Sequence, residues 1–321
     1  MGMTNTKNKA ELIKDKLKKN ISLTAFIILF IFFSLTTDGK FLTSNNIQTL
    51  LGASIDLLIC ALGATFIIML GSIDLSSGSM ISLCGVIAAK IYETTTSTLA
   101  AVLAAIAVSV LFYGIMGVAH TRLQVPTFIV TLGFLSIARA VVTMISSGTI
   151  TMIPFDSPFK KYFGLKPWII ILGLVMFIIV WLIERYTLFG RYTRLIGGDE
   201  RVAKLSGINV NKQKVLVFLF AGLLTAIGGV VMAARIGSGS PAIGQGYELN
   251  VISAVVLGGT SQRGGIGGVR GTLIGALTLA VLSNGLVLLG MPSEVQLFIK
   301  GIVLILAVYV TLERNPNAIT K

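Results

Sequence analysis

Ten long apolar runs constrain the fold of this chain more than any other feature. They lie at about 21–36, 47–70, 76–92, 98–118, 125–146, 167–184, 215–235, 249–259, 271–290 and 296–312. A helix needs about 20 mostly apolar residues to cross the hydrocarbon core of a bilayer, and these runs lack the alternation of membrane β-strands. Because the backbone of a membrane segment must satisfy its own hydrogen bonds, the runs predict an all-α fold, a polytopic transmembrane helical bundle of about ten spans.

The charged residues predict how this bundle is oriented. They make up 12% of the chain, and the formal net charge is +13, whereas roughly 25% of residues are charged in soluble domains. The basic residues cluster at the ends of apolar runs, and no RNA- or DNA-binding motif accompanies them. The charge therefore indicates membrane orientation and contact with membrane lipid, and no nucleic-acid partner.

The first twenty residues are rich in lysine and predict a cytoplasmic amino terminus, since cytoplasmic loops carry the excess of Lys and Arg. Alternation of the spans then places the carboxyl terminus and the polar loop 187–214 on the same side. Of the 26 Lys and Arg residues, 18 fall in segments assigned to the cytoplasm. Residues 21–321 are predicted to form a single transmembrane domain.

The eighth run is too short to span. About ten helical residues rise only ~15 Å, half of the ~30 Å hydrocarbon core. Glycine-rich segments flank this run on both sides, and irregular backbone at membrane depth is tolerated only inside protein or beside water. We therefore expect a broken or half helix in the wall of a pathway.

Two glycine-rich segments of the chain resemble each other weakly, and we call this similarity the internal echo. The segments FIIMLGSIDLSSGSMISL and AVVLGGTSQRGGIGGVRGTLIGAL both join an apolar run to a new span through a turn rich in glycine. The two halves are either a two-fold internal repeat, as in many transporters, or a chance recurrence of glycine-rich breaks.

The first break places Asp74 and Ser76 at the junction of two spans. Either residue, or Ser77, can cap the following helix by accepting its free backbone N–H groups. The functional interpretation makes Asp74 an acceptor in the pathway. Both roles are compatible, because the amino end of a helix beside a pathway binds polar solutes.

Asp56 and Arg139 are the charges deepest within the second and fifth runs. Intramembrane charges normally face the bundle interior and find a partner, so the first prediction is a structural Asp56–Arg139 pair. The alternatives are a gating or solute-contact role and a position nearer to the membrane surface.

Polar residues near the half helix can hydrogen-bond a neutral polyol in the pathway. They are Gln245, Tyr247, Glu248 and Asn250, together with Asn284 in the ninth run. An equally good interpretation of Asn284 is a polar contact that joins two helices.

The sequence lacks the motifs of several enzyme classes. It has no G-x-x-x-x-G-K-[ST] loop for nucleotide phosphates, and its single histidine excludes an H-E-x-x-H zinc site. The two cysteines show no metal-ligand spacing, and no pair of nucleophile and base is recognisable. We therefore expect no catalytic residue, metal or cofactor in this chain, and a membrane-embedded enzyme is the less favoured alternative.

Three segments together resemble one family. They are GSIDLSSGSMISLCGVIAA, LFGRYTRLIGGDERVAKLSGINV and GYELNVISAVVLGGTSQRGGIGGVRGTLIGALTLAVLSNGLVLLG. This combination is similar to the membrane permease subunits of ribose-type ABC importers, and the similarity in motif order extends from the second run to the tenth.

The resemblance implies a permease domain in the bacterial inner membrane that imports a monosaccharide by alternating access. It implies a second permease protomer, an extracytoplasmic sugar-binding protein and cytoplasmic ATPase subunits that bind ATP and Mg²⁺. The absent phosphate loop agrees with this division of labour. The competing hypothesis is a carrier driven by an ion gradient, with Asp56, Asp74 and Glu248 as candidate ion sites.

The polar loop 187–214 is predicted to couple the permease to the ATPases. In this family a short cytoplasmic helix fits a groove on the ATPase, and residues 198–207 match its loose E-A-A-x-x-x-G pattern in part. Arg201 and Val202 replace the glutamate and the first alanine. The predicted contact residues are Gly198, Asp199, Glu200, Arg201, Ala203, Lys204 and Gly207. The alternative is that the basic residues only anchor the loop to anionic headgroups.

Overall fold

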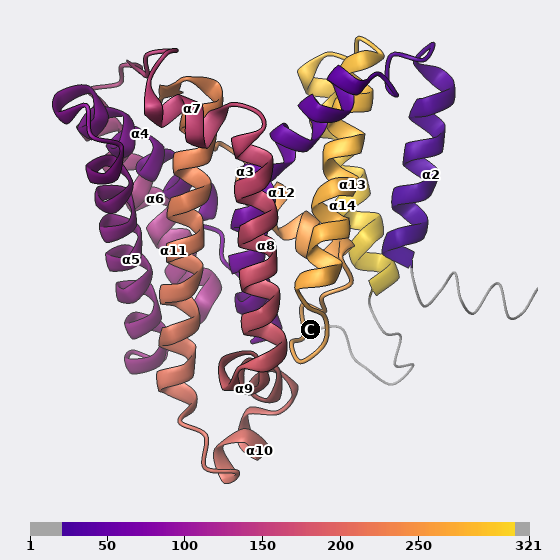
Figure 1. The fold of residues 1–321 in the computed structure, drawn as a ribbon. Helices are drawn as coiled ribbons and strands as arrows, with labels where there is room; N and C mark the ends of the chain where they lie inside the picture. The colour runs from indigo at the N-terminus through magenta and orange to yellow at the C-terminus, as the bar shows by residue number, and fades with distance from the viewer. Residues whose placement is uncertain (1–20, 312–321) are drawn as a thin grey trace, which may run out of the picture.

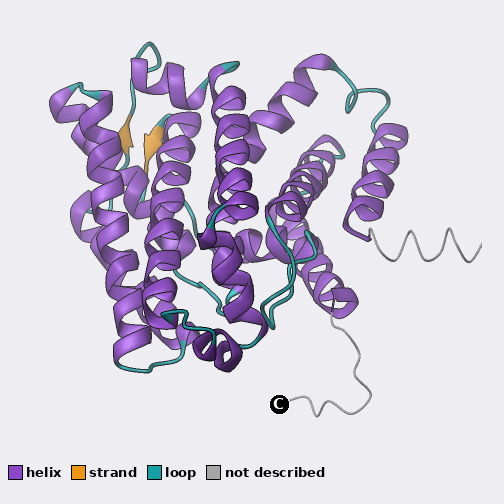
Figure 2. Cartoon of the chain, turned by 60° about the horizontal axis from the view of Figure 1, so that its bottom comes forward, coloured by secondary structure: helices purple, strands orange, loops and turns teal. Residues whose placement is uncertain are grey.

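A computed structural model describes residues 21–311, which are mostly helical (Figure 1). The helices are α2 (Ile21–Thr36), α3 (Ser44–Met69), α4 (Ser77–Thr95), α5 (Thr98–Arg122), α6 (Thr127–Ser146), α7 (Pro158–Gly164), α8 (Trp168–Tyr186), α9 (Leu188–Gly198), α10 (Glu200–Leu205), α11 (Val210–Ile236), α12 (Tyr247–Leu257), α13 (Val269–Leu288) and α14 (Ser293–Thr311). Two short strands, β1 (Thr151–Met152) and β2 (Ser238–Gly239), pair antiparallel (Figure 2). The predicted cytoplasmic segment 1–20 lies outside the described residues.

All ten apolar runs fall on helices, namely α2 to α6, α8 and α11 to α14. Six of the described helices, α3, α5, α6, α8, α11 and α13, are long and apolar enough to cross a membrane. The chain is therefore an all-α, multi-helix membrane protein. Helix α12 has 11 residues, which confirms the short helix predicted for the eighth run.

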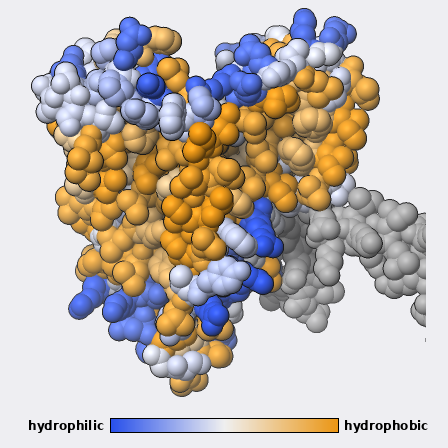
Figure 3. Space-filling view, in the orientation of Figure 1, coloured by the Kyte–Doolittle hydropathy of each residue, from blue (hydrophilic) through white to orange (hydrophobic). Residues whose placement is uncertain are grey.

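The polarity of the molecular surface changes along the length of the bundle. Apolar side chains form a belt around the middle, and polar side chains gather at the two ends (Figure 3). Figure 1 places α7 and the α2–α3 and α13–α14 turns at one end, which we call the α7 end. The α10 end, opposite, carries α9, α10 and the α12–α13 turn. Such a belt suits a bilayer, where lipid covers the apolar side chains.

Helix α3 is the centre of the bundle. In its most apolar window 89% of the residues are buried, against 22% in α6 and in α8. Small residues let α3 and α11 approach closely, since a Cβ added to Gly63 would lie 3.1 Å from the Cα of Ala221. In Figure 1, α3 passes between a block of α4, α5, α6 and α11 and a second block of α2, α12, α13 and α14.

The two segments of the internal echo contact each other at the α10 end. The hydroxyl of Thr65, the residue just before the first segment, lies 2.6 Å from that of Thr272 in the second. Gly265 N–H donates to the Met69 carbonyl at 2.9 Å. A Cβ on Gly271 would collide with the Gly258 carbonyl, so close helix packing explains this glycine. The α12–α13 loop is thereby packed onto the end of α3.

Candidate functional site

The first polar region centres on Asp56 in α3, whose side chain is 1% exposed. Its Oδ2 accepts hydrogen bonds from Arg235 Nη2 and from the Tyr247 hydroxyl, each at 3.0 Å. The Asp56–Arg139 pair predicted from the sequence is therefore wrong. Arg235 takes the place of Arg139 because it ends α11, and α11 packs along α3.

Arg139 stabilises an irregular loop instead. Its guanidinium donates to the carbonyls of Pro241 at 2.7 Å and Ile243 at 3.3 Å, in the loop between β2 and α12. Helix α6 packs mainly on α4 and α5, which keeps Arg139 on the side of this loop. The guanidinium thus donates hydrogen bonds to loop carbonyl groups that accept none from a helix or a sheet.

A pocket of about 270 Å³ lies beside Asp56, among α3, α11, α12, α13 and α14. Hydroxyl, amide and charged side chains converge on it, next to apolar residues such as Leu50 and Leu57. The polar lining residues are Thr49, Asp56, Arg235, Tyr247, Asn250, Ser283, Asn284 and Lys300. A recess in which polar groups converge beside apolar side chains is suited to a small molecule.

The Asp56–Arg235 pair keeps two atoms without partners. Asp56 Oδ1 and Arg235 Nε are buried and make no hydrogen bond to any described residue. A buried polar atom without a partner costs about 1–3 kcal/mol, so each such atom in a native protein calls for an explanation. One acceptor and one donor are thus left over on residues that line the pocket.

Three of the seven predicted pathway residues, Tyr247, Asn250 and Asn284, line this pocket. Asn284 also exchanges two amide hydrogen bonds of 2.9 Å with Asn46. The interpretation of Asn284 as a contact that joins two helices is therefore confirmed, and its side chain borders the pocket as well.

Two further predicted pathway residues lie elsewhere around α12. Gln245 is exposed in the loop before α12. Glu248 lies against the first turn of α4, where a Cβ on Gly78 would collide with its carboxylate. Neither side chain borders the pocket beside Asp56.

The last two, Asp74 and Ser76, belong to a separate buried cluster. Asp74 Oδ1 accepts from the N–H of Ser76 at 2.8 Å and from its hydroxyl at 2.6 Å, and Oδ2 accepts from the Tyr113 hydroxyl at 2.6 Å. Ser76 itself makes no side-chain cap bond to α4. The carboxylate therefore serves the start of α4 and ties it to α5, in line with the capping interpretation.

The second polar region is the predicted coupling segment 198–207, which contains the single short helix α10. Asp199 caps this helix, since its Oδ1 accepts from the N–H of Arg201 at 2.8 Å and of Val202 at 3.0 Å. Gly207, with a φ of +81°, follows the last turn in a left-handed conformation that favours glycine. In Figure 1, α10 projects beyond α9 at the tip of the molecule.

The exposed face of α10 differs from the predicted one. Ala203 is only 2% exposed and packs into the apolar core, so it cannot meet a partner protein. Leu205, at 88%, and Val202, at 57%, are exposed instead. The physical reason is helix geometry: the face that packs onto the bundle includes Ala203, which turns its neighbours outward. Gly198, Arg201 and Lys204 remain exposed as predicted.

Glu200 is partly engaged within the chain. Its Oε2 pairs with Lys214 Nζ of α11 at 2.7 Å. The carboxylate is about half exposed, so this pair contributes little to stability. It does tie α10 to the start of α11.

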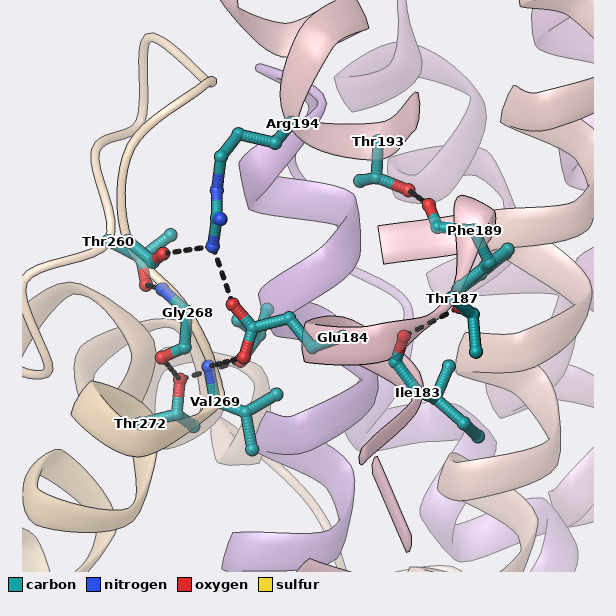
Figure 4. A network of polar contacts seen from close by, with 12 residues as sticks. Ile183, Glu184, Thr187, Phe189, Thr193, Arg194, Thr260, Gly268, Val269 and Thr272 are labelled. Atoms are coloured by element: carbon teal, nitrogen blue, oxygen red, sulfur yellow. Dashed lines mark hydrogen bonds and ion pairs between the residues drawn. The ribbon is translucent and has the colours of Figure 1, made fainter. Parts of the chain in front are cut away.

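A polar network joins α8, α9 and α13 at the α10 end (Figure 4). Glu184 Oε1 accepts from Arg194 Nη2 at 2.6 Å, and Oε2 accepts from the N–H of Val269 at 3.0 Å. Arg194 Nη2 also donates to the Gly267 carbonyl at 3.1 Å. Both carboxylate oxygens are thus used, and the side chain of Glu184 is only 9% exposed.

Helix α9 is held firmly by other contacts as well. Gln213 Nε2, from α11, donates to the Phe189 carbonyl and to the Thr193 hydroxyl, both at 3.0 Å. A Cβ on Gly197 would collide with the Met69 carbonyl at the end of α3. α9 therefore links the exposed α10 to the ends of α3, α11 and α13.

Sequence reasoning missed Glu184, Arg235 and Tyr113 as members of these clusters. All three lie inside or at the end of an apolar run, where a polar residue signals a buried contact. The sequence therefore indicates that these three residues make buried contacts, but it does not indicate with which residues.

Comparison with known proteins then decides the class of this chain. A family model described as the permease component of the branched-chain amino acid transport system matches residues 46–308. The chain belongs to this permease family.

Several curated permeases are similar over nearly their whole length. The ribose import permease protein of Escherichia coli (strain K12) is 38% identical over 309 residues, which cover 92% of this chain and 94% of that protein. The ribose import permease protein of Bacillus subtilis (strain 168) is 37% identical, covering 87% and 88%. The xylose transport system permease protein of Haemophilus influenzae is 33% identical, covering 90% and 95%. No solved structure matches the chain.

Membership assigns the two polar regions to a membrane permease, which conducts a solute and is not itself an enzyme. Within residues 21–311, no three His, Cys, Asp or Glu side chains gather as a metal site requires.

Proposed function

We propose that this chain is the membrane subunit of a bacterial ATP-binding-cassette importer for a neutral monosaccharide of the ribose type. The near full-length similarity to permeases named for ribose and xylose carries the proposal. Both sugars are uncharged pentoses, so the proposed substrate is a small polyol recognised by hydroxyl-directed hydrogen bonds.

The pocket beside Asp56 is the proposed sugar site. A sugar hydroxyl both donates and accepts, and Asp56 Oδ1 and Arg235 Nε are an acceptor and a donor without partners. Both atoms are enclosed in this conformation, so the proposal requires that movement of the helices during transport opens them to the sugar. Tyr247 and Asn250 add a hydroxyl and an amide to the same pocket. The few partners suit a transporter, because a permease must release its substrate.

The α10 end is the proposed cytoplasmic side, where the ATPases dock on α10. Leu205 and Val202 offer an apolar contact, and Arg201 and Lys204 surround it with charge. A short helix with apolar anchors and a charged rim is a common form of recognition by a groove.

The network around Glu184 is the proposed route of coupling. Movement of α10 displaces α9, and the Glu184–Arg194 contacts pass this displacement to the first residue of α13. From Val269 to Asn284, α13 extends about 22 Å at 1.5 Å per residue and reaches the pocket. α3 likewise extends about 20 Å from Met69 to Asp56, at 1.5 Å per residue, and reaches the same pocket.

In the proposed assembly two permease protomers, identical or related, form the pathway between them. All ten apolar helices then cross or enter the inner membrane, with both chain termini on the cytoplasmic side. An extracytoplasmic binding protein delivers the sugar at the α7 end, and the ATPases bind ATP and Mg²⁺. The internal echo makes α3–α4 and α12–α13 the proposed repeat units.

Purification of the full-length chain in mild detergent from its native host tests the proposal. We expect an ATPase and a soluble sugar-binding protein to be retained. With the complex in proteoliposomes, ATP hydrolysis should rise when binding protein and ribose or xylose are both present. Uptake by the chain alone under a proton or sodium gradient would instead support an ion-driven carrier and overturn the proposal.

A further inference from the structure

A second pocket, of about 390 Å³, lies at the α10 end between the last turn of α8, α9 and the start of α13. Four arginines line it, Arg185, Arg191, Arg194 and Arg270, with one carboxylate, Glu184, and one aromatic ring, Trp181. The rest of the lining is four glycines, which add no side-chain bulk. The transport function proposed above uses Glu184 and Arg194 for coupling, but it gives no role to Arg185, Arg191 or Arg270.

The positive charge of the pocket is mostly uncompensated. Glu184 is taken by Arg194 and by the backbone of Val269. The side chains of Arg185 and Arg191 make no hydrogen bond or ion pair with another residue in the part of the chain that the structure describes. The Arg270 guanidinium lies 4.8 Å from the centre of the Trp181 ring. Three guanidinium groups around one recess favour an anion with several oxygens, such as a phosphate.

The surroundings of the pocket distinguish a lipid from a soluble anion. Leu174, Ile178 and Leu182 are exposed on one face of α8, at the spacing of successive helical turns. This apolar face leads directly to Arg185, and Figure 3 shows the apolar belt giving way to polar side chains towards the α10 end. Trp181 lies near the end of α8 and borders the pocket, and tryptophan is enriched where membrane helices meet the polar surface of the bilayer.

We propose that the pocket binds the phosphate headgroup of an anionic phospholipid, whose acyl chains lie along α8. Basic pockets between membrane helices on the cytoplasmic side are suited to such headgroups. The ATPase is the less favoured occupant, because α10 projects farther from the belt and the pocket lies at the end of α8 itself (Figure 1).

The two tryptophans of the chain allow a direct test. Trp168 begins α8 at the α7 end and Trp181 borders the pocket, so Trp168→Phe leaves one reporter beside the pocket. The full chain is placed in phosphatidylcholine nanodiscs and titrated with brominated phosphatidylglycerol, which quenches tryptophan on contact. We expect quenching at a much lower mole fraction than with brominated phosphatidylcholine.

Removing charge from the pocket should weaken this preference. Arg185→Gln with Arg191→Gln should lower the apparent affinity for phosphatidylglycerol about thirtyfold, and each single change about fivefold. The matched control, Arg201→Gln with Lys204→Gln, removes the same charge from α10 outside the pocket and should leave the affinity unchanged. The single variants keep the test valid if the double variant does not insert.

Three results would overturn the proposal. Equal losses in the pocket and control variants would mean general surface attraction. Displacement of the lipid by inorganic phosphate in solution would identify a site for a soluble anion. Loss of ATPase co-purification from the pocket variant, with lipid quenching unchanged, would make the pocket an ATPase contact.

Discussion

Two carboxylate–arginine pairs, Asp56–Arg235 beside the 270 Å³ pocket and Glu184–Arg194 at the α10 end, differ in how fully the carboxylate oxygens are hydrogen-bonded. Glu184 uses both oxygens, one for Arg194 and one for the backbone of Val269. Asp56 receives two donors on Oδ2 and leaves Oδ1 without a partner among the described residues. The Glu184–Arg194 pair thus uses both carboxylate oxygens within the protein, whereas the Asp56–Arg235 pair retains bonding capacity.

This difference separates two physical roles. A saturated pair holds its helices in one arrangement, so it can pass a movement from α9 to α13. An unsaturated pair beside a pocket carries an energetic cost that a hydroxyl group can remove. Changes at the α10 end should therefore alter coupling, and changes at the pocket should alter sugar passage.

The largest effect is expected from breaking the unsaturated pair. Asp56→Leu removes the partner of the Arg235 cation and should cost about 3 kcal/mol of stability, the lower end for a buried pair because the Arg235 side chain is 30% exposed. Asp56→Leu combined with Arg235→Met should regain most of that loss, because both charges are gone. Thermal unfolding in detergent measures both, and sugar uptake should be absent in both. Normal uptake by the stable double variant would show that these side chains do not contact the sugar.

Breaking the saturated pair, Glu184–Arg194, should impair the coupling of ATP hydrolysis to transport and not the contact with the sugar. Glu184→Gln keeps the size of the side chain but loses a charge-assisted bond to Arg194, at a cost of about 2 kcal/mol. We expect ATP hydrolysis to continue while the amount of sugar transported per ATP falls about tenfold. The ratio of uptake to hydrolysis in proteoliposomes checks this.

Glu200→Gln is the matched control for Glu184→Gln, since it breaks the exposed pair with Lys214 and should change stability by less than about 1 kcal/mol. A fall in the transport ratio for Glu200→Gln as large as for Glu184→Gln would remove the distinction between a coupling contact and a surface pair.

A smaller effect is expected at the end of α10. Gly207 has a φ of +81° and open space around its Cβ position, so Gly207→Val should cost about 1–2 kcal/mol of backbone strain without disturbing the core. We expect the chain to fold and insert but to retain far less ATPase during purification. Gly207→Asn, which tolerates this backbone conformation, should retain most of it. Full retention by the valine variant would contradict docking on α10.

The smallest effect is expected where two helices meet at the edge of the pocket. Asn46→Ala and Asn284→Ala should each lower stability, with an interaction energy of about 0.6 kcal/mol in a double-mutant cycle, typical of polar contacts in membrane proteins. Asn284→Ala should also weaken sugar uptake more than Asn46→Ala does. Equal losses of uptake would assign Asn284 to helix packing alone.

The helices were largely predictable, because helix formation in a membrane depends on local apolar length. The ten runs fall on ten helices, and the short α12 and the Asp199 cap of α10 follow from nearby residues. The pocket beside Asp56 was predictable in part: Asp56, Tyr247, Asn250 and Asn284 were singled out, whereas Arg235 was missed. Glu184, in the network at the α10 end, was missed as well.

The sequence by itself thus determined the class of the chain, the order of its helices and the position of its polar segment. Tertiary structure decided which polar groups meet. Asp56 pairs with Arg235 and not with Arg139 because α11, not α6, packs along α3. Ala203 is buried and Leu205 exposed because α10 packs on one particular face. The physical reason is that apolar residues facing lipid and apolar residues facing another helix have the same composition, so only packing selects the partner.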